Sequence, residues 1–388
     1  MGALDGYKVL DFSTLLPGPY ATMTLADLGA EVLKVSSKDK YDLVVNWPPV
    51  IEGTQVTGAQ AWLGRGKKTI HLNLKKPAAV EAVRKLIMEY DIIVEQFRPG
   101  VMKKLGLSYE QLREINPRII YCSITGYGQD GPLAMRAGHD INYIARSGIA
   151  ASAGRKMGGP SLYNFQIADV AGGSMNAVTS ILAALIYRER TGKGQYIDVS
   201  MQDSIVPFNS MDGASLFAGG SVPARESGLL NGGGIYDFYE TSDGGYMSVG
   251  ALEPKFWAAL CDGVGHPEWR DGKILRTDTP MVKNELTRIF RTKTRAEWTQ
   301  IFSELDACVE PVMDLNEVAQ DEHLKSRGMW PSVEIPLTDG KKITQMGCPI
   351  HLSESPVQYR HAGYPEGHHT FEILRGLGYS DREIEGMI

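Results

Sequence analysis

Three sites along the chain place titratable side chains next to small or turn-forming residues. His139 and Asp140 follow an Ala-Gly pair in RAGHDINYIARSG, and Asp169 lies in QIADVAGGSM. Glu253 lies in GALEPKFW. Imidazole and carboxyl groups are the side chains that most often move protons in general acid–base catalysis. These positions are therefore candidates for a proton-transfer site.

Each of these side chains also has a purely structural interpretation. His139 could be a hydrogen-bonded histidine of the core. Asp169 precedes a small-residue helical start and could be an N-cap. Glu253 precedes Pro254, a residue that suits the first turn of a helix. Spacing alone leaves both interpretations open.

Glycine-rich turns and nearby cations form a second kind of candidate site. The stretches PGPYA, FRPGV, GYGQDGP and NGGG contain no P-loop and no Gly-x-Gly-x-x-Gly after the first strand, which argues against nucleotide hydrolysis and dinucleotide binding. A guanidinium beside such a turn can clamp phosphate, although charged side chains are usually a solvated face. The cations in question are Arg65, Lys67, Lys68, Lys75 and Arg98.

Composition narrows the class of protein. The 388 residues carry a net charge of -6, with 43% hydrophobic and 22% charged residues, which argues against a nucleic-acid-binding surface. The four cysteines are scattered and sit mostly in apolar contexts, as expected of buried free thiols. No signal peptide or apolar run of membrane-spanning length is evident, so we expect a cytoplasmic enzyme without membrane attachment.

The first 200 residues alternate β-branched runs with helical patterns. This alternation predicts a Rossmann-like, doubly wound parallel sheet in an α/β fold. Ser108 with Gln111, and Ser380 with Glu383, have capping-box spacing at helix starts. The expected strands are KVLDF, EVLKV, TIHLNL, DIIVEQ, RIIYCSI and QYIDVS.

The pattern changes after residue 205. Residues 206–228 read as a Gly- and Ser-rich linker, and residues 235–252 as a hairpin joined at Ser-Asp-Gly-Gly. Helical segments then follow, so we expect a smaller α+β domain. The predicted division is a large domain at 1–205, the linker, a small domain at 229–325, and a return to the large domain at 326–388.

The chain as a whole resembles the family III coenzyme A-transferase superfamily, and within it the α-methylacyl-CoA racemases. The resemblance runs through LPGPYATMTLADLGAEVLKV, GRGKKTIHLNLKKP, FRPGVMKKLGL, NPRIIYCSITGYGQDGP, AGHDINYIARSG, IADVAGG and YETSDGGYMSVGALEPKFW. It implies that His139 and Asp169 are the two bases of a racemase, and that Glu253 supports the histidine. The GHDINY block separates racemases from transferases, which use the aspartate as a nucleophile.

The implied chemistry is epimerisation of a 2-methylacyl-CoA thioester through an enolate. One base removes the α-proton on one face, and a second delivers a proton to the other, so His139 and Asp169 must start in opposite protonation states. This predicts that Asp169 is partly desolvated, with a raised pKa. The enolate oxygen also needs hydrogen-bond donors.

The resemblance also implies a CoA site and no required cofactor or metal. Many racemases have an arginine after the second strand where this chain has Ser37, so Lys38 or Lys40 is left to replace it, and residues 41–55 form an insertion beside it. The residues expected to bind CoA are Leu72, Asn73, Leu74, Lys75, Arg98, Gly138, Asp140 and Tyr143.

Three functions remain open: racemase, CoA-transferase and non-catalytic CoA-thioester binding. Gly232, Gly233 and Gly234 favour a transferase, because transferases of this family often carry a glycine-rich loop, whereas His139 with Glu253 favours a racemase. The resemblance implies an interlocked homodimer in which Glu253 could serve the partner's histidine. Tyr163, Phe165, Tyr236, Phe238, Met157, Met201 and Met211 could line an acyl pocket or belong to the core.

Overall fold

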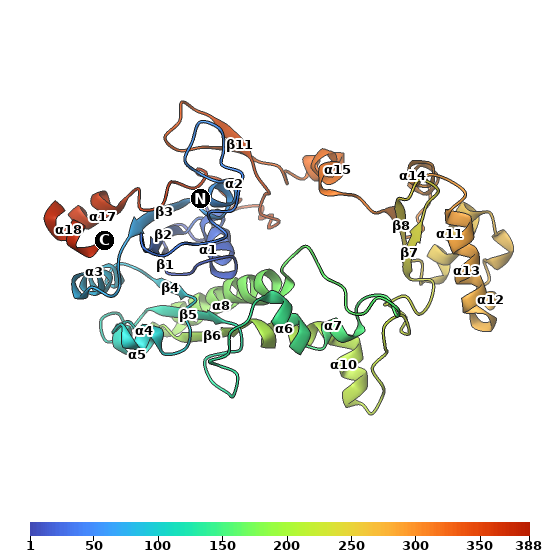
Figure 1. The fold of residues 1–388 in the computed structure, drawn as a ribbon, viewed down its shortest axis with the longest axis horizontal. Helices are drawn as coiled ribbons and strands as arrows, with labels where there is room; N and C mark the ends of the chain where they lie inside the picture. Colours follow the sequence, from blue (N-terminus) through green and yellow to red (C-terminus); the bar gives the residue numbers. More distant parts are fainter. The chain divides into compact units, whose positions relative to one another are not determined.

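The computed structural model describes residues 1–388, apart from the side chain of Arg276. It divides into two compact units (Figure 1). The first comprises residues 1–147, 165–207 and 322–388, and the second comprises 148–164 and 208–321. The expected linker holds a helix, α10 (Ser210–Phe217), and residues 148–164 belong with the second unit. The domain boundaries expected from the sequence remain predictions.

The first unit is built on a six-stranded sheet in the order β3-β2-β1-β4-β5-β6, with every pair parallel. This is the doubly wound order, and the predicted fold class is confirmed. Its switch point lies between β1 and β4, where ligands of such sheets bind at the carboxyl ends of the strands. The strands are β1 (Lys8–Asp11), β2 (Glu31–Ser36), β3 (Lys67–His71), β4 (Ile92–Glu95), β5 (Ile120–Thr125) and β6 (Tyr196–Ser200).

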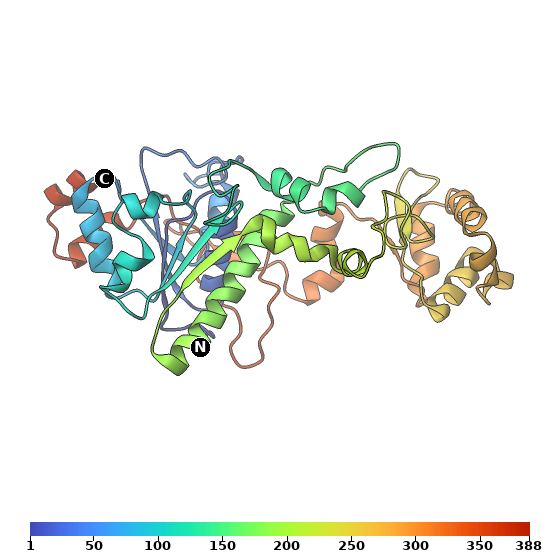
Figure 2. The same ribbon diagram turned by 90° about the horizontal axis from the view of Figure 1, so that it is seen from below.

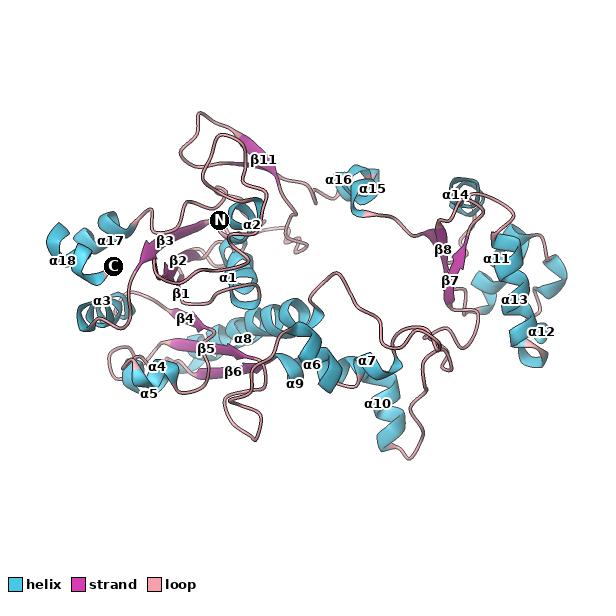
Figure 3. Ribbon diagram, in the orientation of Figure 1, coloured by secondary structure: helices cyan, strands magenta, loops and turns pink.

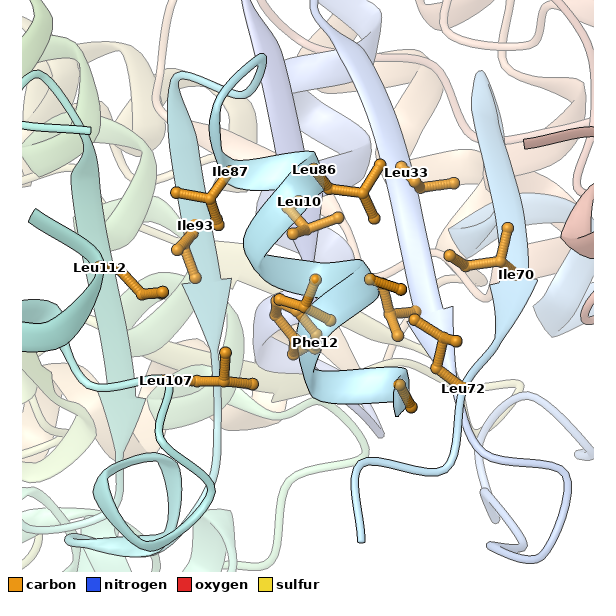
Figure 4. Close-up of a cluster of buried hydrophobic side chains, with 14 of the residues drawn as sticks. Leu10, Phe12, Leu33, Ile70, Leu72, Leu86, Ile87, Ile93, Leu107 and Leu112 are labelled. Carbon is orange, nitrogen blue, oxygen red and sulfur yellow. The ribbon is translucent and has the colours of Figure 1, made fainter. Parts of the chain in front are cut away.

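Helices cover both faces of this sheet (Figure 2). One face packs against α3 (Pro77–Ile87), α4 (Val101–Lys104), α5 (Tyr109–Arg113), α17 (Thr370–Gly376) and α18 (Asp381–Met387). Figure 4 shows this core, in which Leu10, Leu33 and Ile93 of the strands meet Leu86 of α3. The remaining elements of the unit are α1 (Pro17–Asp27), α2 (Gly58–Leu63), α6 (Asp140–Arg146), η1 (Ala168–Met175), α8 (Asn176–Thr191), α9 (Met201–Ile205), α16 (Glu322–Ser326), β10 (Ser332–Glu334) and β11 (Lys342–Thr344).

The carboxylate of Asp11 is buried under α1 and is neutralised by two lysines from the sheet. Asp11 lies within 3.6 Å of Lys34 and 3.5 Å of Lys67. Burial opposes ionisation of Asp11, but the two ammonium groups and hydroxyls of Ser13 and Thr22 outweigh it and lower its pKa to about 2. Burial lowers the pKa of Lys67 to about 8. Buried charges of this kind are tolerated only when paired.

The second unit combines a small antiparallel sheet with a group of helices (Figure 3). The predicted hairpin is confirmed as β7 (Asp237–Glu240) paired with β8 (Tyr246–Val249), and β9 (Val309–Pro311) extends it. Trp257, Phe290 and Trp298 lie in its core. Its other elements are α7 (Ile149–Ser152), η2 (Val206–Asn209, which starts in the first unit), α10, α11 (Pro254–Val264), η3 (Pro267–Trp269), α12 (Lys273–Thr277), α13 (Thr279–Phe290), α14 (Arg295–Ser303) and α15 (Leu315–Gln320).

The combined helix of η1 and α8 spans Ala168–Thr191, and by length and composition it could cross a membrane. This differs from the expectation that no apolar run reaches that length. A core helix passes the same test, and 44% of the apolar window is buried. Arg188, near its end, is also buried and lies 3.0 Å from Asp91. The helix is therefore part of the packing of the first unit.

Three of the four cysteines are buried as expected. Cys308 is exposed, so the expectation of a buried thiol is wrong at that position. It adopts a positive φ of 51° beside the strand β9. All four cysteines are free.

The segment before α17 forms hydrogen bonds with the edge strand β3. His369 is 5% exposed, and its Nδ1 accepts a hydrogen bond of 3.2 Å from the Thr69 backbone N–H. Its own N–H donates to Thr69 O at 2.9 Å. Because Nδ1 accepts, the ring must be neutral at that atom. Burial, together with His368 nearby, lowers the pKa of His369 to about 4.

This contact predicts an acid-sensitive first unit. The folded pKa of His369 lies below its ordinary value of 6.5, so stability is complete above pH 6.5 and falls as the pH drops toward 4. His369→Asn keeps an acceptor near the position of Nδ1 without a titrating ring, and should flatten this part of the pH dependence of the urea midpoint. His351→Asn, at an exposed position, is the control. An unchanged pH dependence in His369→Asn would contradict the assignment.

Candidate active site

His139 lies at the carboxyl edge of the sheet, at the end of the loop that follows β5. It is the residue before α6, with extended backbone angles, and its N–H donates to Asn142 Oδ1 at 3.0 Å. Its side chain is exposed in the first unit. The interpretation of His139 as a core histidine is therefore wrong, and the ring is accessible to a ligand.

Glycines allow an aromatic ring to brace the loop that carries His139. The Tyr143 hydroxyl donates to Gly138 O at 2.6 Å. A Cβ atom added at Gly138 would lie 2.7 Å from the Tyr143 ring, and one added at Gly126 would lie 2.5 Å from it. Tyr127 packs edge-on against the same ring, with centroids 5.1 Å apart. The AGHD and TGYG stretches therefore need glycine for close packing.

Asp169 lies in the first turn of η1, which has π-helical hydrogen bonding. Such segments are rare and often occur at functional sites. A Cβ atom at Gly172 would lie 2.8 Å from Ile205 of α9, and one at Gly173 would lie 3.1 Å from Met201. The Gly-Gly pair thus lets η1 approach α9 closely. Asp169 is not an N-cap as its structural interpretation required, since the N-cap residue is Ile167.

The carboxylate of Asp140 joins the two candidate bases. Its Oδ1 accepts hydrogen bonds from Ala168 N at 2.6 Å and Asp169 N at 3.0 Å. Asp140 directly follows His139, so the first turn of α6 is tied to the first turn of η1. These hydrogen bonds hold His139, which precedes Asp140, and Asp169 in the same region of the first unit.

The environment of Asp169 favours its protonated form. Burial, with a smaller contribution from the Asp140 carboxylate, raises the pKa of Asp169 to about 7. Burial also raises the pKa of Asp140, although the two backbone N–H groups oppose this. A carboxyl group with a pKa near neutrality can both donate and accept a proton at physiological pH.

Glu253 belongs to the second unit, whereas His139 and Asp169 belong to the first. It is the N-cap residue of α11, with Pro254 in the first turn as expected, and its side chain makes no capping hydrogen bond. It is exposed. The first unit by itself therefore contains two of the three predicted catalytic side chains.

The loops predicted to bind CoA follow the strands β3, β4 and β5 at the carboxyl edge of the sheet. Asn73 Oδ1 accepts from Lys75 N at 3.1 Å, which shapes the turn after β3. The Lys40 ammonium lies 5.5 Å from the centre of the Phe97 ring, so the loops after β2 and β4 are in contact. Lys75 and Arg98 are exposed, and neither forms an ion pair within the described residues. Their binding of CoA stays a prediction.

Two cations considered for phosphate binding are buried instead. Arg65 donates from Nε and Nη2 to the Asp27 carboxylate at 2.9 and 2.6 Å, and from Nη1 to Met346 O at 2.9 Å. Lys67 is paired with Asp11 under α1. The interpretation of Arg65 and Lys67 as phosphate ligands is therefore wrong, because the buried aspartates need them as counter-charges. Lys68 is exposed and pairs with Glu372 at 3.1 Å.

Sequence reasoning missed the role of Glu95 at the end of β4. Its carboxylate accepts from Phe97 N at 2.8 Å and from the Ser123 hydroxyl, and it is buried. Burial raises its pKa to about 7. Glu95 therefore shapes the turn that presents Arg98. A carboxyl residue at a strand end, two residues before the FRPG stretch, is the signal that could have indicated this role.

The second unit contains a cavity of about 830 Å³. Four of the aromatic and methionine residues considered for an acyl pocket line it: Tyr163, Met211, Tyr236 and Phe238. Met201 instead lies in the packing of the first unit, where it is 4% exposed. Within the described residues, no group of three or more His, Cys, Asp or Glu side chains is placed to hold a metal ion.

Comparison with known proteins defines the class and then the family. A CAIB/BAIF family protein from Brucella suis has a similar solved structure, with a TM-score of 0.84, 29% identity, and coverage of 97% of this chain and 99% of that one. The sequence matches CoA-transferase family III over residues 4–370. The chain belongs to CoA-transferase family III.

Relatives of known name include enzymes of two kinds. The chain is 36% identical over 385 residues to alpha-methylacyl-CoA racemase of Homo sapiens, covering 98% of this chain and 95% of that protein. It is 34% identical over 389 residues to succinyl-CoA:glutarate CoA-transferase of Homo sapiens, covering 98% and 87%. The resemblance to the family found from the sequence is confirmed, and the chain is an enzyme of this family.

The tie at Asp140 predicts a measurable shift in the pKa of Asp169. Asp140→Asn keeps an oxygen that can accept from the backbone of η1 but removes the negative charge, so the pKa of Asp169 should fall while burial keeps it above the ordinary value. Carboxyl-carbon NMR of labelled aspartate would measure this, with Asp169→Asn identifying the signal. Asp130→Asn, in the exposed part of the preceding loop, should leave the pKa unchanged. An equal pKa in Asp140→Asn and the wild type would contradict the coupling.

Proposed function

We propose that this enzyme epimerises 2-methylacyl-CoA thioesters by transferring the α-proton between two bases. His139 removes or delivers the proton on one face of the α-carbon, and Asp169 does so on the other. The observation that carries the proposal is the raised pKa of Asp169, about 7, in the same unit as an exposed histidine. A carboxyl group with a pKa near 7 can take up and release a proton at neutral pH, so Asp169 can exchange its protonation state with the imidazole in each turnover.

Neutral pH suits the role of Asp169 as a proton donor and acceptor. A carboxyl with a pKa near 7 is protonated in a large fraction of molecules, so it can return a proton to the enolate. The same carboxyl with an ordinary pKa would be almost wholly ionised and a poor proton donor. The thioester itself acidifies the α-carbon, since the resulting carbanion is delocalised as an enolate. Backbone N–H groups near the GHD turn are the proposed donors to its oxygen.

The thioester's CoA portion is proposed to bind the carboxyl edge of the sheet. Lys75 and Arg98 supply cations for its phosphates. Lys40, beside Phe97, takes over the role of the arginine that many racemases have at the position of Ser37. No metal or additional cofactor takes part in this chemistry.

A CoA-transferase is the second candidate. In that reaction Asp169 attacks as a nucleophile and carries the acyl group and then CoA. The specific observation in its favour is the loop of Gly232, Gly233 and Gly234, whose Gly232 adopts a φ of 90° and accepts a hydrogen bond from Lys283. The identity to a CoA-transferase of Homo sapiens also supports it.

Solvent exchange distinguishes these reactions. A single epimer of a 2-methylacyl-CoA is incubated in D2O with no free acid, and deuterium incorporation and configuration are followed. The wild type should exchange the α-hydrogen and invert the centre. His139→Ala and Asp169→Asn should each lose inversion by about 100-fold or more. Each variant should keep exchange without inversion for the epimer whose α-hydrogen faces the remaining base.

Controls and contrary outcomes follow directly from the chemistry. His351→Ala, which removes an exposed imidazole elsewhere, should behave as the wild type. Absence of α-hydrogen exchange, together with transfer of CoA to a carboxylic acid once that acceptor is added, would instead identify a transferase. Binding of the thioester without exchange or transfer would identify a non-catalytic protein.

We also propose that the enzyme works as a homodimer with shared sites. Large apolar side chains are exposed on α10 and the following segment, with Phe217 91% and Leu229 61% exposed in the single chain. Surfaces of this kind usually meet a partner. In this arrangement Glu253 of the partner subunit would hold the imidazole of His139 and fix its tautomer.

Mixed dimers test this sharing. Co-expression of His139→Ala chains with Glu253→Ala chains places one intact pair in each mixed dimer, so epimerisation should recover well above that of either variant alone. The activity of separately purified homodimers is the control. Absence of recovery, with mixed dimers present by mass spectrometry, would place Glu253 and His139 of one chain in the same site.

A further inference from the structure

The turn between β1 and α1, residues 12–18, is held by side chains from three different segments. Ser13 N donates to Asp11 Oδ1 at 2.8 Å, and Gly18 N donates to Gln96 Oε1 at 3.0 Å. Between them, Leu15 N donates to Asp42 Oδ2 at 2.8 Å. Leu15 has a φ of 61°, in the left-handed region that disfavours a leucine. The turn therefore contains one strained residue, and the carboxylate of Asp42 holds its N–H.

Asp42 belongs to the insertion after β2. The residue is 7% exposed, and its Oδ1 accepts from Val44 N at 2.9 Å and from Val45 N at 3.2 Å. The carbonyl of Val45 in turn accepts from the Thr57 hydroxyl at the start of α2. The insertion is thus folded against the unit, with its one buried carboxylate shared between its own backbone and the strained turn.

The residues at the end of this turn also contact η1. Pro17, at the start of α1, has its carbonyl 2.6 Å from the Ser174 hydroxyl, which also lies 3.1 Å from Asp169 O. A Cβ atom added at Gly173 would lie 3.1 Å from Pro17 Cβ. Ser174 is wholly buried. Pro17 is therefore in direct contact with η1 near Asp169.

We propose that Asp42 is a positioning residue for Asp169, acting through Leu15, Pro17 and Ser174. The inference rests on the proposed function only in taking Asp169 as the reacting carboxyl, which the transferase alternative also requires. Proton transfer depends on the alignment of the base with the α-carbon, and a displacement of about 1 Å can reduce a rate by about 100-fold. The insertion therefore supports catalysis rather than only the binding of CoA.

The test compares turnover with thioester binding. Asp42→Ala should lower kcat for epimerisation by about tenfold or more, while KM changes by less than about threefold. Hydrogen exchange measured by mass spectrometry should be faster in the peptide that covers residues 167–175. Glu52→Gln, at an exposed position of the same insertion, is the matched control and should leave both readouts unchanged.

Rescue by glycine separates positioning from a general loss of stability. Glycine adopts a φ of 61° without strain. In the double variant Asp42→Ala/Leu15→Gly the turn should therefore keep its shape without the carboxylate, and most of kcat should return. Asp42→Asn, which retains only one acceptor oxygen, takes the place of Asp42→Ala should that variant not fold.

Three outcomes would overturn the inference: an unchanged kcat in the Asp42 variants, a rise in KM alone, or a loss of kcat that Leu15→Gly does not restore. A wild-type protein without epimerase activity would instead count against the proposed function. In that case the exchange rates of η1 in the Asp42 variants still decide whether Asp42 positions Asp169.

Discussion

The carboxylate of Asp140 is the contact on which the site of the first unit depends. It accepts hydrogen bonds from two backbone N–H groups at the start of η1, and Asp140 is the residue directly after His139 in the chain. The N–H groups of a helix start have no intrahelical acceptor, so a carboxylate is well suited to bind them. The same negative charge disfavours ionisation of Asp169. The Asp140 side chain therefore has two effects. It holds His139 and Asp169 in the same part of the first unit, and it contributes to the raised pKa of Asp169.

Close packing around η1 is the second condition for this site. Gly172 and Gly173 remove side chains where α9 and the start of α1 press against the helix. Met201 and Ile205 of α9 and Pro17 of α1 approach this Gly-Gly pair. Burial is the main cause of the raised pKa of Asp169 in the same helix.

Much of the first unit could be predicted from the sequence because its signals are local. The six strands follow from β-branched runs, and the capping boxes at Ser108 and Ser380 are both present. The desolvation of Asp169 followed from the chemistry that the family resemblance implied. Burial of Arg65 and Lys67 could not be predicted, because it depends on Asp27 and Asp11, which lie far away in sequence. The hydrogen bond from Leu15 to Asp42 joins two loops and leaves no local pattern.

The chain crosses between its two compact units at residues 147/148, 164/165, 207/208 and 321/322. The first two crossings fall between His139 and Asp169, so the excursion through 148–164 separates them along the sequence. A hybrid enzyme that takes its second unit from a relative would need both pieces, 148–164 and 208–321, to be exchanged together. Exchanging only one of the two segments would produce a cavity lined partly by residues of one parent and partly by residues of the other.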